Sequence, residues 1–130
     1  VVLAIGVIPD TAVLKSSGIQ LGSRGHIVVD EHLRTNQPDI YAVGDAIEVI
    51  DFVSGQPTAI PLAGPANKQG RIAAGNIAGI SSRFAGSQGT SILKVFSLTA
   101  AATGNNERTL QRLGKSYRTV YAHPNSHASY

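Results

Sequence analysis

An apolar run that stops at Gly-Asp constrains this chain more than any other feature. Residues 40–43 (I-Y-A-V) predict a buried strand, which Gly44 and Asp45 end abruptly. Such a strand places a carboxylate at the carboxyl edge of a sheet, where α/β folds bind ligands. Glycine allows close approach of the backbone, and the carboxylate can accept hydrogen bonds from two hydroxyls of a sugar or sugar alcohol. The alternative is a turn in which the aspartate caps the next segment.

The segment 62–78 is predicted to be a helix that starts near two prolines and ends at Gly79. Pro61 and Pro65 are tolerated there, since the first N–H groups of a helix have no partner within it. We expect one face of this helix to pack on the sheet that carries Asp45, because small side chains allow close approach. Residues at helical spacing form that face: Ala63, Ala66, Gly70, Ala73 and Ile77.

Short strands and helices are expected elsewhere as well. Apolar residues 1–5 predict a strand buried on both faces, a short helix should run from residue 10 or 11 to about 17, and 26–30 should be a strand. After a Gly/Ser-rich linker, the pattern predicts an unfinished α+β unit. Its expected elements are strands at 91–97 and 99–103, a helix at 106–113 that is capped by Asn105 or Asn106 and stopped by Gly114, and a strand at 117–122.

Composition indicates an ordinary folded chain and excludes several kinds of site. Hydrophobic residues make up 42% and charged residues 15% of the 130 residues, unlike a disordered chain. Cysteine is absent, which excludes disulfides, thiolate metal sites and redox thiols within this sequence. No apolar run approaches the roughly 18 residues of a membrane span, and no signal-peptide pattern opens the chain. We therefore expect a soluble, cytoplasmic protein. The lack of methionine and the apolar opening predict a piece of a longer chain.

Charge is divided unevenly between the two parts of the sequence. Residues 1–51 hold seven acids and three bases, whereas residues 52–130 hold eight bases and one acid. The bases are scattered singly and few aromatic residues are available for base stacking, so no nucleic-acid partner is expected. The asymmetry favours a phosphate-bearing small molecule or an acidic partner surface.

Three motifs in sequence order resemble one enzyme family. They are A-x-G-x-x-P-D at 4–10, T-N-Q-P-D-I-Y-A-V-G-D at 35–45 and P-L-A-G-P-A-N-K-Q-G-R at 61–71. Together they resemble the FAD/NAD-linked disulfide reductases, and most of all the single-cysteine branch of CoA-disulfide reductases, NADH oxidases and peroxidases, and persulfide reductases. Residues 89–107 are similar to the start of that family's dimerisation domain. Residues 123–130 resemble a segment of the CoA-disulfide reductases.

The resemblance implies an α/β to α+β fold class: a partial FAD-binding Rossmann-like domain followed by the start of an α+β dimerisation domain. Residues 1–80 would be the C-terminal part of the FAD-binding domain, 81–90 a linker and 91–130 the N-terminal part of the dimerisation (interface) domain. The implied partners are a second copy in a homodimer and a small-molecule thiol or disulfide such as CoA disulfide. No nucleic acid and no membrane is expected.

The resemblance also implies residues that bind FAD. Asp45 matches the aspartate that binds the ribitol chain, with Gly44 giving clearance. Leu62 and Ala63 match the start of a helix beside the flavin pyrimidine. Free N–H groups and the positive end of that helix favour the negative charge that a reduced flavin gathers near N1 and O2. Simple cover of the sheet is the alternative for the helix.

Candidate catalytic residues lie at the C-terminal end of the sequence. In the enzymes that the chain resembles, the C-terminal domain of one subunit contributes to its partner's active site. Tyr130 and His127 are therefore expected to face the thiol substrate across a dimer, an ordinary interface tyrosine being the alternative. His123 and His127 also have the spacing of a metal pair, but Pro124 and the missing third ligand argue against a metal site.

The activity that the resemblance implies belongs to a longer protein. Electrons would pass from NAD(P)H through FAD to a cysteine-linked disulfide, with CoA disulfide or persulfide as substrate. The alternatives are an NADH oxidase or peroxidase, a ferredoxin or rubredoxin reductase, and a non-catalytic self-association domain. The sequence contains neither a G-x-G-x-x-G fingerprint nor a redox cysteine. Alone, the chain is expected to be inactive and to associate through exposed apolar surface.

Overall fold

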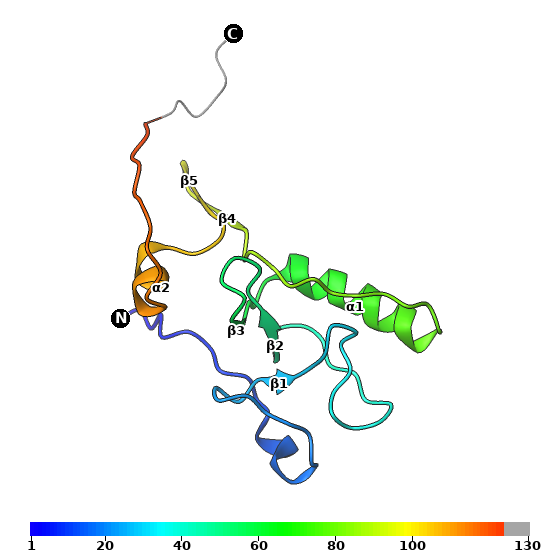
Figure 1. Ribbon diagram of the computed structural model, residues 1–130. Helices are drawn as coiled ribbons and strands as arrows, with labels where there is room; N and C mark the ends of the chain where they lie inside the picture. Colours follow the sequence, from blue (N-terminus) through cyan, green and yellow to red (C-terminus); the bar gives the residue numbers. More distant parts are fainter. Residues whose placement is uncertain (124–130) are drawn as a thin grey trace.

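The computed structural model describes residues 1–123, so that His127 and Tyr130 lie outside the described part of the chain. The described elements form two small sheets and a few helices (Figure 1). In chain order they are η1 (Ala12–Ser16), β1 (Ile27–Val28), β2 (Ile47–Ile50), β3 (Pro57–Thr58), α1 (Ala63–Ile77), β4 (Ser91–Val95), β5 (Leu98–Ala102) and α2 (Glu107–Arg112). Neither α-helix in this part has the length and apolar character that crossing a membrane demands.

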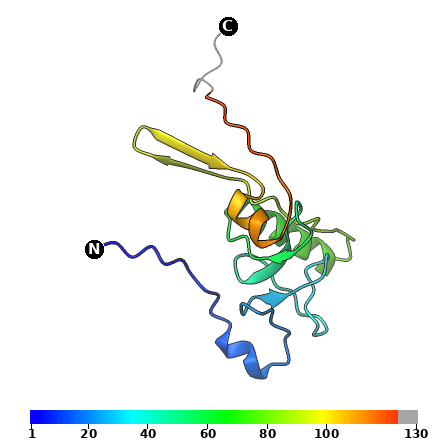
Figure 2. The same ribbon diagram turned by 60° about the vertical axis from the view of Figure 1, so that its left-hand side comes forward.

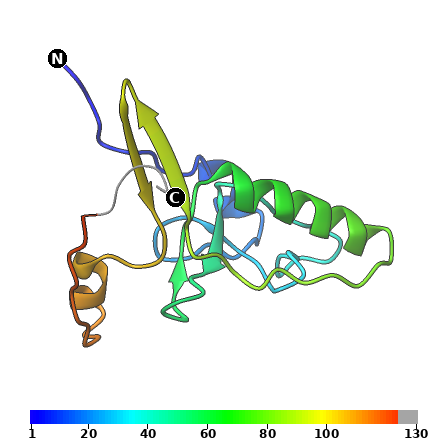
Figure 3. The same ribbon diagram turned by 90° about the horizontal axis from the view of Figure 1, so that it is seen from above.

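The first sheet contains three strands in the order β1-β2-β3. β1 pairs with β2 in parallel, with Ile27 opposite Ile47, and β3 returns antiparallel to β2. The side chains of Ile47 and Val49, two residues apart on β2, are buried, as expected where one face of a strand meets a core. Helix α1 starts beside this sheet and extends away from its strands (Figure 3).

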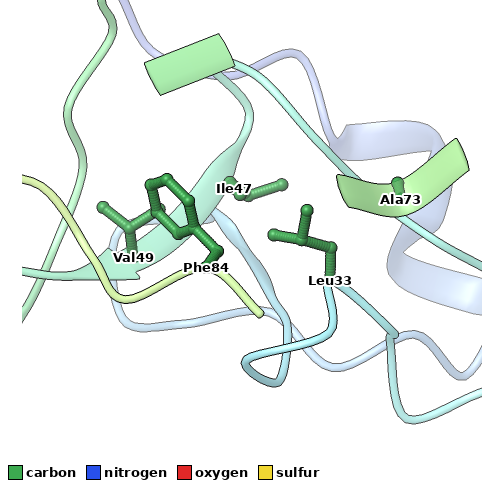
Figure 4. Packing of buried hydrophobic residues seen from close by; sticks show 5 residues of the cluster. All are labelled: Leu33, Ile47, Val49, Ala73 and Phe84. Atoms are coloured by element: carbon green, nitrogen blue, oxygen red, sulfur yellow. The ribbon is translucent and has the colours of Figure 1, made fainter. Parts of the chain in front are cut away.

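The core is small and draws on segments far apart in the sequence. Its buried members are Leu33, Ile47, Val49, Ala73 and Phe84 (Figure 4). Ala73 is the contribution of α1, and Phe84 comes from the segment 81–90, which the sequence predicts to be a linker. The Phe84 side chain packs in this core. Its backbone N–H also donates a hydrogen bond of 2.8 Å to the Glu31 carbonyl, which holds the segment against the preceding part of the chain.

The face that α1 buries differs from the predicted one. The helix forms as expected, and Ala73 is buried as predicted, but Ile77 is 67% exposed. The other buried residues of α1 are polar, Gln69 and Asn76. Both amides hydrogen-bond to buried or half-buried groups, which removes most of the penalty for taking a polar side chain out of water. Tertiary hydrogen bonds therefore decided which face turned inward.

The second sheet is a hairpin that projects from the rest of the molecule (Figure 2). β4 and β5 pair antiparallel from Ser91 opposite Ala102 to Val95 opposite Leu98, and all of their residues are exposed. Helix α2 follows, and the side chain of its N-cap Asn106 accepts a 3.0 Å hydrogen bond from the Thr109 N–H. Both strands and this capped helix confirm the sequence prediction for 91–113.

Three predicted strands are absent from the described residues: 1–5, 40–43 and 117–122. Residues 1–5 are exposed, and only Tyr41 of the second segment pairs, in an isolated antiparallel bridge with Arg34. A strand exists only where a neighbour satisfies its backbone N–H and C=O groups. Within residues 1–123, none of these segments meets a continuous partner.

Gly44 and Asp45 consequently do not end a strand, as the sequence predicted. They form a turn that precedes β2, and Asp45 lies just before the amino end of that strand. The expected helix at residues 10–17 is shorter and of the 3-10 type, and the strand expected at 26–30 is reduced to β1.

Candidate functional site

The three motifs of the sequence meet at one surface hollow of about 420 Å³. Asp45 lies on its wall, exposed to solvent, in the turn before β2. The chain that leads into α1 forms another part of the wall. Residues of the first motif form a third part. The lining residues that come from the motifs are Val7, Ile8, Pro9, Asp10, Asp45 and Pro61.

The hollow carries both signs of charge. Asp10 and Asp45 supply carboxylates, while Arg24 and His26 line the same hollow from the turn before β1. Carboxylates accept hydrogen bonds from hydroxyl groups, and a guanidinium donates to anionic oxygens. No group of three or more His, Asp or Glu side chains within residues 1–123 is arranged to hold a metal ion.

The turn at Gly44 has a conformation that only glycine adopts easily. Its φ is 85°, in the left-handed region. A Cβ atom built there would meet nothing within 4 Å, so the backbone conformation calls for glycine and the space beyond it is open. The Gly44 N–H donates to Oε1 of Gln69 at 2.8 Å, which ties this turn to helix α1.

Helix α1 begins beside the hollow. Leu62 is its N-cap residue, with extended backbone and no side-chain capping hydrogen bond. Pro61, directly before it, lines the hollow. Pro65 in the first turn has no N–H, and Ala63 is exposed. The helix therefore presents backbone N–H groups and the positive end of its dipole without a side-chain cap.

Of the four predicted cofactor-binding residues, only Asp45 lines the hollow. Gly44 directly precedes it, and Leu62 and Ala63 follow the lining residue Pro61. The predicted residues His127 and Tyr130 lie outside the described residues. Sequence reasoning missed Gln69, although a signal for it exists. Gln69 belongs to a series at heptad-like spacing that includes both apolar and amide side chains: Leu62, Ala66, Gln69, Ala73 and Asn76.

A buried carboxylate outside this hollow connects the first sheet to the segment that follows the β4–β5 hairpin. Asp51, directly after β2, accepts hydrogen bonds from Oγ of Ser54 and Nδ2 of Asn105, each at 2.6 Å, and from the Val53 N–H at 3.0 Å. Burial alone would raise the pKa of Asp51, but these hydrogen bonds stabilise the charged form and the net shift lowers it. Because Asn105 lies next to α2, Asp51 anchors the segment beyond the hairpin to the first sheet.

Solved structures share the fold of this chain. The reduced CoADR-RHD of Bacillus anthracis superposes with a TM-score of 0.84 and 52% identity over 88% of this chain, which corresponds to 21% of that protein. An NAD-dependent persulfide reductase from A. fulgidus superposes with a TM-score of 0.81 and 39% identity, over 84% of this chain and 20% of the other.

Sequence comparison agrees. The NAD(P)H sulfur oxidoreductase (CoA-dependent) of Pyrococcus furiosus is 35% identical over all of this chain and 29% of its own length. The chain therefore spans less than a third of that relative. The family model described as pyridine nucleotide-disulphide oxidoreductase matches residues 1–70, which include the turn at Asp45 and the start of α1. The chain belongs to the pyridine nucleotide-disulphide oxidoreductase family.

Proposed function

We propose that this chain forms one wall of the FAD site in a flavoprotein oxidoreductase. The complete protein would pass electrons from NAD(P)H through FAD to a cysteine-linked disulfide, with CoA disulfide or persulfide as its substrate. The observation that carries the proposal is that Asp45 and Pro61, the residue directly before the N-cap of α1, line one hollow. Relatives named for CoA-dependent sulfur and persulfide chemistry support the choice of substrate.

The residues around the hollow fit FAD. The Asp45 carboxylate would accept hydrogen bonds from ribitol hydroxyls, and the open space beside Gly44 would let the cofactor lie against the backbone. The uncapped first turn of α1, at Leu62 and Ala63, would stabilise negative charge. FAD, when bound, supplies the chemistry that accepts a hydride and passes on electrons.

The proposal extends to domain organisation and partners. Residues 1–80 would complete the FAD-binding domain, which the family match over 1–70 supports. The segment 81–90 would lead into a dimerisation domain that begins at 91, for which the projecting hairpin is the support. In a cytoplasmic homodimer, Tyr130 and His127 would face the thiol substrate of the partner subunit.

An NADH oxidase is the second candidate. The NADH oxidase of Methanocaldococcus jannaschii is 38% identical over 80% of this chain, and the same FAD wall would serve either reaction. NADH consumption by the complete protein, measured with CoA disulfide in the absence of oxygen and then with oxygen alone, separates the two.

Replacing Asp45 tests the proposal. Asp45→Ala removes an acceptor of charged hydrogen bonds, each worth about 1.5–3 kcal/mol, so FAD should bind the complete protein at least about tenfold more weakly. Titration of apoprotein with FAD measures the loss. Asp39→Asn is the control: it removes one charge from an exposed position with φ of 60° that asparagine tolerates. Equal FAD affinity in Asp45→Ala and the unmodified protein would overturn the assignment.

A further inference from the structure

We propose that Gln69 is a positioning residue for the Asp45 carboxylate. Its carboxamide would hold the Gly44–Asp45 turn in the orientation that presents Asp45 to the hollow. The inference rests on the proposed function, because it concerns the same FAD wall. It assigns Gln69 no contact with the cofactor.

The burial of Gln69 is the first observation. Although glutamine is polar, its side chain here is only 1% exposed, on the face of α1 that meets the core. Its Oε1 atom accepts the Gly44 N–H at 2.8 Å. Since a backbone N–H can only donate, the oxygen of the carboxamide must point at Gly44. A side chain of α1 therefore contacts the residue directly before Asp45.

The constraints around Asp45 are the second observation. Gly44 is held at its N–H by Gln69 and at its carbonyl by the Ile47 N–H at 3.4 Å. Beyond Asp45, the Ala46 carbonyl accepts the Ile27 N–H at 2.9 Å. Asp45 thus lies between two anchored residues, and the Gln69 contact is the anchor that comes from the helix.

The hydrogen bond between Gly44 and Gln69 connects the two elements that the proposed function places beside FAD. The N-cap of helix α1, Leu62, directly follows the lining residue Pro61, and the helix reaches back to the Asp45 turn through Gln69. One rigid helix thereby relates the two elements that would contact FAD, the uncapped helix start and the carboxylate. Gly44 has φ of 85° and open space beside it, so without the Gln69 oxygen the turn would lose its tie to the helix and would keep only the backbone hydrogen bonds on its carboxyl side.

Asn76 on the same helix provides a matched control. It is 9% exposed, and its amide bonds to the His32 carbonyl and to the backbone of Ser82, at distances of 2.8–3.0 Å. None of these three residues lines the hollow beside Asp45. Asn76 therefore shares the helix, the burial and the hydrogen bonding of Gln69 but not its proximity to Asp45.

The experiment compares variants of the complete protein. Gln69→Met keeps the length of the side chain and removes the acceptor, and Asn76→Leu removes the control amide. Each variant is titrated with FAD as apoprotein, below the midpoint of its own thermal unfolding. We expect Gln69→Met to bind FAD about tenfold more weakly. Asn76→Leu should lower the unfolding temperature at least as much but change FAD affinity less than about threefold.

A double variant separates positioning from general stability. If Gln69 acts through Asp45, Gln69→Met combined with Asp45→Ala should bind FAD no more weakly than Asp45→Ala alone, because residues that act as a unit are not additive. Additive losses, or equal losses in Asn76→Leu and Gln69→Met, would overturn the inference. Gln69→Leu takes the place of Gln69→Met if the latter does not fold.

The two proposals fail in different ways. Unchanged FAD affinity in Gln69→Met, together with a tenfold loss in Asp45→Ala, would overturn the role of Gln69 and leave the FAD wall intact. A complete protein that binds no FAD, or that binds it equally well after Asp45→Ala, would overturn the proposed function itself.

Discussion

Two regions of the molecule form by different means: one is the first sheet together with α1, and the other is the β4–β5 hairpin. β1, β2 and β3 are short, and their burial depends on Leu33, Ala73 and Phe84, which come from distant segments. The hairpin has longer strands, all of them exposed, joined by a tight turn at Phe96 and Ser97. Its pairing is local, so loop closure costs little entropy. The first region obtains its structure from packing and the second from adjacency in sequence.

This difference determines where a site can exist. In the first region, buried polar side chains such as Gln69 and Asp51 are held by defined hydrogen bonds. Such bonds give a carboxylate a fixed orientation. Residues of the hairpin are open to solvent and lack that support, which suits a surface for association better than a binding pocket.

The largest expected effect follows from the burial of Ile47. This side chain is 1% exposed, whereas Leu93 on the hairpin is 63% exposed. Ile47→Ala should lower the free energy of unfolding by about 2–5 kcal/mol through the cavity that it leaves, and Leu93→Ala by less than about 0.5 kcal/mol. Urea unfolding followed by circular dichroism measures both. Similar losses at the two positions would contradict the comparison.

The link between the first sheet and the segment that follows the hairpin, made by Asp51 and Asn105, should depend on pH. The folded-state pKa of Asp51 lies below its ordinary value of 3.8, so its contribution to stability is present above that pH and is lost as the pH falls through the lower, folded pKa. Asp51→Asn, which offers one acceptor oxygen to several donors, should cost about 1.5–3 kcal/mol near neutral pH.

The difference between Asp51→Asn and the unmodified chain should shrink as the pH falls below about 4. Thermal unfolding at a series of pH values would show it. A constant difference across the series would mean that ionisation of Asp51 does not support the link to Asn105.

The smallest effect concerns the turn of the hairpin. Phe96 has φ of 53° and is 95% exposed, so it combines backbone strain with little packing. Phe96→Gly relieves a strain of about 1–2 kcal/mol, partly offset by the entropy of glycine. We expect a net local gain of up to about 1 kcal/mol, seen as slower hydrogen exchange of the β4 and β5 amides. Faster exchange would show that the Phe96 side chain stabilises the hairpin.

The sequence by itself determined the elements whose partners are close in the chain. Helix α1 follows from its prolines and helical spacing, α2 from its Asn106 cap, and the hairpin from two apolar runs separated by a turn. These features depend on torsion angles and neighbouring hydrogen bonds, which a few adjacent residues specify. The order of the motifs also indicated the family, which the comparisons confirmed.

Only the tertiary structure decided the features that need distant partners. The apolar residues at 1–5 and 40–43 have strand-like patterns, but a pattern supplies no neighbour to pair with, so Asp45 came to lie before β2 and not after a strand. Burial of Gln69 likewise required the Gly44 N–H, 25 residues away in sequence, as its partner. Hydrogen bonds across such separations depend on which surfaces meet, and that information is not contained in any local segment.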